Sequence, residues 1–229
     1  TLYTWIVELS EQPKGEAVIP IGGDPEGPFA TRRNLIRNGS FADSFDRWTL
    51  YTWIVELSEQ PKGEAVVTAV AGEPTLRVTR DGKGHADVKI RQVLNQDVSD
   101  YGSLRLQLTF RIVNQSLSVC GTLGSECPLF IKLNYLDQNG IAQLWQHGFY
   151  AEGVVNPDTS PEGCISCAVV QSTHERVQLG QITFYDVDLA EEFSRLGALP
   201  PKFIESVELA FLGHSFEVEV VDVALMAEE

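Results

Sequence analysis

The chain has 229 residues, enough for one or two domains, and 43% of them are hydrophobic, which is sufficient for a packed core. Its formal net charge is −15 with a pI of about 4.6, so it lacks the basic footprint that nucleic acids and anionic lipid surfaces require. No apolar run reaches the roughly eighteen residues of a membrane span, and we therefore expect neither nucleic-acid binding nor membrane insertion.

The first feature along the chain is a repeat. Residues 1–18 and 49–66 carry the same eighteen letters, TLYTWIVELSEQPKGEAV. Repeat architectures need several imperfect copies at a fixed period, so this is not one of them. Three interpretations stay open: an artefact, a recent duplication, or a spare strand that can replace its twin in its own fold or in a neighbour's.

A Pro/Gly-rich stretch, residues 20–33, follows the first copy and is typical of a linker. The predicted division is therefore an arm over residues 1–33, consisting of the strand copy and the linker, and a domain over residues 34–229. Strand patterns then recur between turn signals, and 103–113 alternates most cleanly between apolar and polar residues. Residues 1–9 and the second repeat copy are predicted as strands. Further strands are predicted at 66–72, 75–80, 86–94, 103–113, 129–137, 141–150, 177–189, 203–213 and 215–226.

Two turn signals and one helix complete the pattern. Residues 81–84, DGKG, predict a turn, and Asn139-Gly140 predicts a hairpin. One short helix is predicted at 189–197, with Asp188 as its N-cap and Gly197 at its end. So many strands with one helix indicate an all-β fold, an antiparallel β-sandwich of the jelly-roll type.

Four cysteines lie in two predicted loops: Cys120, Cys127, Cys164 and Cys167. If all the strands are antiparallel, both loops lie at the same end of the sandwich. Two disulfides and an oxidising compartment are predicted, because the number is even and both segments are loops. Cross-loop pairing, local pairing and a four-thiolate zinc site remain open, and a redox role is disfavoured because no helix begins beside the C-x-x-C.

The stretch NLIRNGSF (34–41), Trp48 and the final strand FEVEVVDVALM (216–226) together resemble the galactose-binding-like β-sandwich, in particular bacterial jelly-roll carbohydrate-binding modules. The resemblance covers roughly residues 34–229. It implies that the opening segment pairs near the C-terminal strand. The positions that carry it are Asn34, Asn38, Gly39, Phe41 and Asp222.

Many members of that family hold a structural calcium with an acid placed directly after the Gly-x-Phe. This chain has Ala42 there and Asp43 one residue later. Asp43, Asp46 and Asp222 can still supply oxygen ligands for calcium, although acids that cap turns in solvent would give the same pattern.

The resemblance also implies a sugar-binding sheet face, on which polar side chains bond hydroxyl groups and an aromatic ring stacks on a pyranose. A solvated face of an antiparallel sheet would show the same alternation. The residues expected on the binding face are Arg105, Gln107, Arg111, Lys132, Asn134, Trp145 and His147.

No catalytic pattern stands out: no nucleophile elbow, no marked carboxylate pair and no phosphate loop. We therefore expect a non-catalytic, extracellular or cell-surface module that binds carbohydrate or another surface ligand. The alternative is a structural or adhesive subunit that self-associates by strand exchange through residues 1–18.

Overall fold

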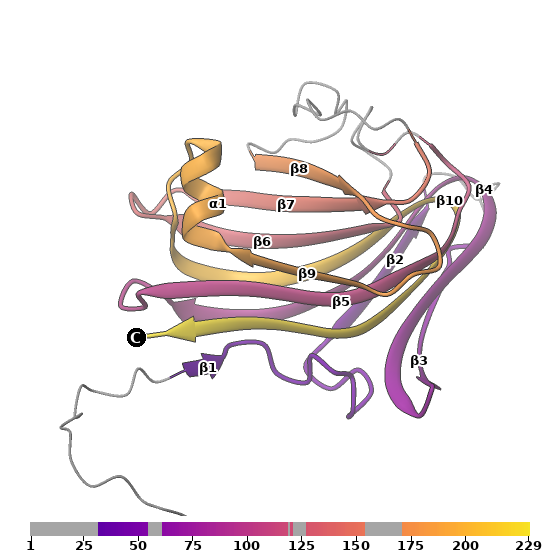
Figure 1. Ribbon diagram of the computed structural model, residues 1–229, viewed down its shortest axis with the longest axis horizontal. Helices are drawn as coiled ribbons and strands as arrows, with labels where there is room; N and C mark the ends of the chain where they lie inside the picture. Colours follow the sequence, from indigo (N-terminus) through magenta and orange to yellow (C-terminus); the bar gives the residue numbers. More distant parts are fainter. Residues whose placement is uncertain (1–31, 55–60, 119, 121–126, 154–170) are drawn as a thin grey trace, which may run out of the picture.

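A computed structural model describes residues 32–54, 61–118, 120, 127–153 and 171–229 (Figure 1). Residues 1–31, and with them the first repeat copy, lie outside the described residues, so the predicted domain division stays a prediction. The elements are β1 (Arg32–Asn34), β2 (Thr49–Ile54), β3 (Glu64–Val70), β4 (Glu73–Asp97), β5 (Ser103–Gln115), β6 (Leu129–Asp137), β7 (Ala142–Tyr150), β8 (Gln171–Arg176), β9 (Thr183–Asp188), α1 (Leu189–Leu196) and β10 (Pro201–Glu228).

The strands form two layers joined by two long strands, β4 and β10. One layer has the order β2-β4-β10-β6-β7-β8, and in the other β10 continues between β4 and β5, with β3 and β9 outside them. Figure 1 shows β4 and β10 curving at one end of the molecule, so that the sheet turns back on itself. The predicted sandwich is thus confirmed, with one exception to its antiparallel pairing: β8 runs parallel to β7.

The bend is a bulge where two separate strands were expected. Gly213 pairs with Ala86 while Ser215 pairs with Asp81, so residues 82–85 face a single residue of β10. The buried guanidinium of Arg80 donates to the carbonyls of Gly84 and Gly213 at 2.7 and 2.9 Å and holds this corner together. The DGKG stretch therefore bends a continuous strand, and the prediction of a turn there was wrong.

The two inner faces share one core. The apolar residues of β5 alternate inward as predicted, and Phe110 meets Phe149 of the other layer with ring centroids 4.5 Å apart. The opening motif pairs with the C-terminal strand, as the resemblance implies: Asn34 lies opposite Met226, and its Oδ1 accepts the Leu225 N–H at 3.0 Å.

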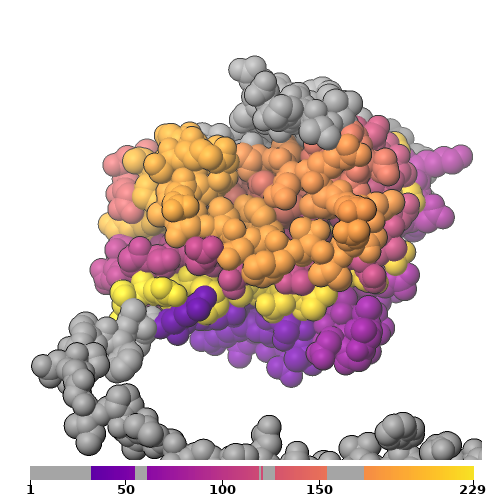
Figure 2. Space-filling view, in the orientation of Figure 1, coloured from indigo at the N-terminus to yellow at the C-terminus, as the bar shows by residue number. Residues whose placement is uncertain are grey.

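The helix α1 begins and ends where the sequence predicts. Asp188 Oδ1 accepts the N–H groups of Ala190 and Glu191 at 2.9 and 3.2 Å, and Gly197 adopts a left-handed conformation, with φ of 66°. Phe193 packs from this helix against Tyr135. In the space-filling view, β8, β9 and α1 form one continuous surface (orange, Figure 2). None of the described helical residues forms a segment long and apolar enough to cross a membrane.

The N-cap supports a first stability prediction. Asp188→Ala leaves two helix N–H groups without their acceptor and should cost about 1 kcal/mol, which lowers the melting temperature by roughly 2–4 °C for a chain of this size. Asp188→Asn keeps an acceptor and should stay within a few tenths of a kcal/mol. Thermal denaturation of both variants checks this, and equal losses in the two would contradict a capping role.

Candidate binding groove

The residues predicted to form one binding face lie on two different faces. Lys132 and Asn134 point outward from the layer that contains β2 and β8, whereas Arg105, Gln107 and Arg111 point outward from the layer that contains β3 and β9. Because the inner faces meet in one core, the two outer faces point away from each other. The predicted set therefore cannot contact one ligand together.

The two arginines of β5 form ion pairs with carboxylates of the neighbouring strands. Arg105 donates to both oxygens of Asp186 at 3.0 and 2.9 Å, and these bonds lower the pKa of Asp186, with a smaller contribution from Gln107. Arg111 pairs with Glu219 of β10. These cross-strand pairs hold neighbouring strands together, so we assign a structural role to this face.

Trp145 and His147 lie inside the sandwich, so their assignment to the binding face was wrong. Trp145 is fully buried beside Phe193, and the His147 ring stacks on Tyr185 with centroids 4.7 Å apart. The reason is the strand phase: Lys132 of β6 pairs with Gln146, which places Gln146 outward and its neighbours inward.

A groove of about 580 Å³ opens on the outer face of the layer that contains β2 and β8. We call it the aromatic groove, because two aromatic side chains of β2, Tyr51 and Trp53, line it and are 51% and 54% exposed. They stand on the same side of β2 because residues two apart on a strand share a face. The remaining lining residues are Asp87, Lys89, Arg91 and Glu208.

Pairing across the sheet brings these residues together from distant parts of the chain. Tyr51 lies opposite Lys89 and Trp53 opposite Asp87, while Arg91 lies opposite Glu208. The two residues of each cross-strand pair are thus separated by tens to more than a hundred positions in the sequence. The alternation of polar and aromatic residues in TLYTWI predicts that Tyr51 and Trp53 lie on one face of a strand. It does not predict that β4 lies beside that strand.

The floor of the groove is charged and mostly paired. Asp87 Oδ2 lies 2.5 Å from Lys89 Nζ, and Lys132 Nζ lies 3.9 Å from Glu208 Oε1 and 5.3 Å from the centre of the Phe130 ring. Burial lowers the pKa of Lys132, a shift that Glu208 opposes and Lys89 reinforces. Asn134 of β6 donates to the Ser206 hydroxyl at 3.0 Å.

Two polar atoms of the floor have no hydrogen-bond partner among the described residues: Asp87 Oδ1 and Arg91 Nε. Asp87 is only 8% exposed. A buried polar atom without a partner costs about 1–3 kcal/mol. Both atoms lie beneath the accessible surface of the groove, so the groups that a ligand can reach are the two exposed aromatic rings and the charged side chains around them.

The predicted calcium ligands do not gather. Among the described acids, histidines and cysteines, Asp43, Asp46 and Asp222 do not form a group of three with neighbouring ligand atoms. Instead, Asn38 organises the loop: its amide nitrogen donates to the carbonyls of Ser44 and Asp46, both at 2.9 Å. Since an amide already binds these carbonyl oxygens, a cation is not needed to hold them.

Asp222 allows a test of this point. It is half-buried, and burial raises its pKa above 3.8, so its ionised form lowers stability as the pH rises above that ordinary value. Asp222→Asn should therefore leave the protein as stable or more stable at pH 7, by at most about 1 kcal/mol after allowing for solvent screening. The difference should vanish below about pH 4.

Thermal melts of this variant with calcium or with a chelator give the measurement, and Asp100→Asn, at an exposed position outside the predicted calcium ligands, is the control. A calcium-dependent stabilisation of the wild type that Asp222→Asn removes would show that the carboxylate holds a cation after all.

The cysteines form a second, smaller cluster on the same face. Cys120 and Cys127 are joined by a disulfide, which is the local pairing, and they pack with Phe130 and Tyr150. Ligand atoms of Cys120, Cys127 and His174 lie within 4.8 Å of one another. A disulfide leaves neither sulfur as a thiolate, so the four-thiolate zinc site and the cross-loop pairing are contradicted. Cys164 and Cys167 lie outside the described residues, so the second disulfide stays a prediction.

Comparison with known proteins gives fold likenesses. No family model and no curated protein matches the chain. Among solved structures it is similar to a family 11 carbohydrate-binding module from Clostridium thermocellum in complex with a β-1,3-1,4-mixed-linked tetrasaccharide (11% identity, 87% of this chain and 96% of that chain, TM-score 0.44). It is also similar to the C-terminal family 22 module of Clostridium thermocellum Xyn10B (12%, 83% and 90%, 0.39).

A third similar structure is winged bean acidic lectin complexed with methyl-α-D-galactose (11% identity, 87% of this chain and 99% of that chain, TM-score 0.46). The sugars bound in these structures are ligands of those proteins, and the residues of the aromatic groove indicate what this chain can bind.

Proposed function

We propose that this protein is a non-catalytic carbohydrate-binding module whose ligand lies in the aromatic groove. The observation that carries the proposal is the juxtaposition of exposed Tyr51 and Trp53 with the positively charged side chains of Lys89 and Arg91 in one groove. Aromatic faces stack on the apolar faces of pyranose rings. A sugar hydroxyl can accept a hydrogen bond from either cationic side chain.

The groove residues favour binding over catalysis. Asp87 is beside Lys89, and Glu208 is near Lys132. Both carboxylates of the groove are thus engaged in ion pairs, whereas a glycosidase uses two carboxyl groups that flank the scissile bond. The Cys120–Cys127 disulfide supports an oxidising compartment. An extracellular or cell-surface location, with residues 34–229 as the binding domain, is part of this proposal.

A glycan array followed by calorimetry on each hit tests the proposal, with calcium and with a chelator. We expect binding to at least one class of polysaccharide or oligosaccharide. Absence of binding to every sugar, under both conditions, would sink it.

Arg91→Lys probes the guanidinium group that lines the groove. Lysine keeps the positive charge but lacks the forked N–H donors of arginine, so one charged hydrogen bond, worth about 1.5 kcal/mol, should be lost. That corresponds to roughly tenfold weaker binding. Calorimetry with the array hit measures it, and Arg77→Lys, in the layer that contains β3, is the matched control. Unchanged affinity in Arg91→Lys would remove Arg91 from the site.

A second candidate function is assembly by strand exchange, and the position of β2 favours it. β2 is an edge strand, paired only with β4 among the described strands, and its six residues occur unchanged at the start of the chain. An identical strand has the side-chain alternation needed for the same register. The first copy would then occupy the place of β2 in its own chain or in a neighbour's.

Deleting residues 1–18 and measuring the mass in solution by light scattering tests strand exchange. We expect loss of an oligomer or of thermal stability in the truncated protein. If association and stability both stay the same, the first copy is passive.

A further inference from the structure

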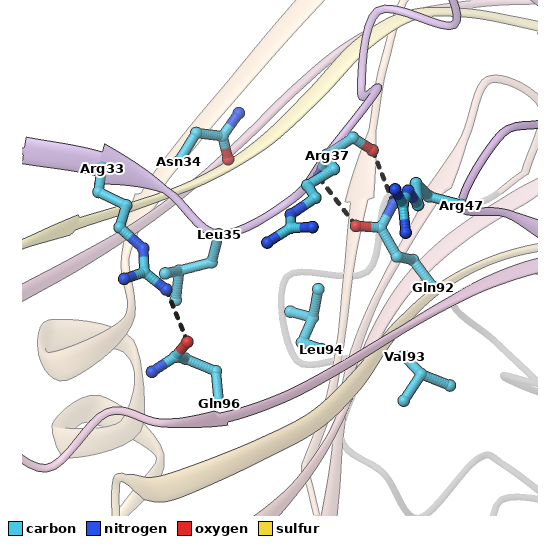
Figure 3. A pocket seen from close by; sticks show the side chains of 9 residues that line it. All are labelled: Arg33, Asn34, Leu35, Arg37, Arg47, Gln92, Val93, Leu94 and Gln96. Carbon is cyan, nitrogen blue, oxygen red and sulfur yellow. Dashed lines mark hydrogen bonds between the residues drawn. The ribbon is translucent and has the colours of Figure 1, made fainter. Parts of the chain in front are cut away.

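A second cavity, of about 460 Å³, adjoins the aromatic groove (Figure 3). We call it the arginine pocket. It lies between β1, the segment that follows it and the end of β4. Its lining residues are Arg33, Asn34, Leu35, Arg37, Arg47, Gln92, Val93, Leu94 and Gln96.

The pocket collects positive charge in a chain whose net charge is −15. Three of its lining residues are arginines and none is an acid. Arg33 donates to the neutral amide of Gln96 at 2.7 Å, and neither Arg33 nor Arg37 forms an ion pair within the described ranges. Figure 3 shows their guanidinium groups turned toward the same space, which Leu35 and Leu94 border.

Side-chain amides fix the backbone that carries these arginines. Gln92, almost fully buried, accepts the Arg37 N–H and donates to the Arg37 carbonyl, both at 2.8 Å. Asn34 Oδ1 accepts the Ile36 N–H at 3.0 Å as well as that of Leu225. The segment from Arg33 to Arg37 is therefore held before any ligand binds, which lowers the ordering cost of binding.

The pocket borders the groove along β4. Arg91 lines the groove, and Val93, two residues later and on the same side of the strand, lines the pocket. Arg47 lies two residues before Thr49, which pairs with Arg91. A chain of sugars that stacks on Tyr51 and Trp53 can thus extend past Arg91 into the arginine pocket.

We propose that the arginine pocket binds the oxyanion substituents, carboxylate or sulfate ester, of an acidic polysaccharide whose neighbouring rings occupy the aromatic groove. This inference rests on the proposed function and narrows its ligand class. Guanidinium groups match planar and tetrahedral oxyanions with paired N–H donors. Charge attraction to an exposed site weakens as salt rises, so binding should do the same.

Calorimetry tests the pocket with four probes: an oligogalacturonate, a sulfated galactan oligosaccharide, a neutral glucan oligosaccharide of equal length, and sodium sulfate. We expect at least one acidic oligosaccharide to bind about tenfold or more tightly than the neutral one, with an affinity that falls as sodium chloride is added. Arg33→Gln/Arg37→Gln should lose at least about tenfold for that acidic probe.

Arg32→Gln/Arg77→Gln removes the same charge outside the pocket and is the control, with an expected change below about twofold. A melting temperature for each variant confirms that it folds. Equal binding of acidic and neutral sugars, or an Arg33→Gln/Arg37→Gln variant no weaker than the control, overturns the inference and leaves the carbohydrate-binding function standing.

Binding of sulfate while none of the three oligosaccharides binds overturns the polysaccharide as the source of the anion. The proposed function fails only if the glycan array also finds no sugar that binds. The two failures are therefore distinguishable.

Discussion

Replacing Tyr51 and Trp53 together by alanine should weaken sugar binding by about 100-fold or more. Each ring contributes apolar area and a stacking term, together about 1.5 kcal/mol per ring, so the pair accounts for about 3 kcal/mol. Both side chains are more than half exposed, so the melting temperature should change little. Calorimetry with the array hit, accompanied by a thermal melt, gives both numbers.

Phe184→Ala is the matched control, because Phe184 is a 62% exposed aromatic residue on β9, in the other layer. It should bind as the wild type does. If Phe184→Ala weakens binding as much as the β2 double variant does, the aromatic groove is not the site.

The repeat adds a further arm to this experiment. Residues 3 and 5 of the first copy are again Tyr and Trp, so a strand that replaced β2 would bring the same rings. Retention of binding in the double variant, followed by its loss when Tyr3 and Trp5 are also changed to alanine, would show that the first copy supplies the groove.

Replacing Gly39 by alanine should be the most destabilising single change considered. A Cβ atom at Gly39 would lie 1.9 Å from the carbonyl oxygen of Val223, a backbone atom of β10. Backbone cannot move aside as a side-chain tip can, so we expect a cost near the upper end for overpacking, about 3 kcal/mol. That lowers the melting temperature by about 6–12 °C for a chain of this length.

Gly102→Ala is the control for this prediction. Its Cβ would come no closer than 3.9 Å to the nearest atom, the Glu228 carbonyl oxygen, so a change within about 0.5 kcal/mol is expected. Thermal denaturation of the two variants under the same conditions measures the difference in stability. A Gly39→Ala protein as stable as Gly102→Ala would mean that the close approach to β10 is not required.

The fold was predictable where the sequence carries a local signal. Strict alternation over 103–113, the cap at Asp188 and the Asn139-Gly140 turn each specify one conformation without help from distant residues. The turn is built as expected: Gly140 has φ of 76°, and its N–H donates to the Asp137 carbonyl at 2.9 Å.

Other elements depend on partners that the local sequence does not reveal. The DGKG stretch has turn residues, but β10 pairs on both sides of it and keeps it inside one strand. On β7, residues 145–150 are all buried, so apolar and polar positions do not alternate and the strand phase cannot be predicted. That is why Trp145 was placed on the wrong face.

The aromatic groove could not be predicted from the sequence for the same reason. The groove forms only because β2 lies beside β4 and β4 lies beside β10, and this strand order is known only from the folded chain. The predicted set of binding residues included Lys132 and Asn134, which lie on the face that bears the groove. It grouped them with residues of β5, which lie in the other layer.

A crystal structure of the protein with the oligosaccharide that the glycan array selects tests the claim that the aromatic groove binds carbohydrate. We predict a pyranose ring stacked on Trp53 or Tyr51, with a hydroxyl within hydrogen-bond distance of the Lys89 or Arg91 side chain. A sugar bound instead on the face of Arg105 and Gln107, or away from both layers' faces, would contradict the claim.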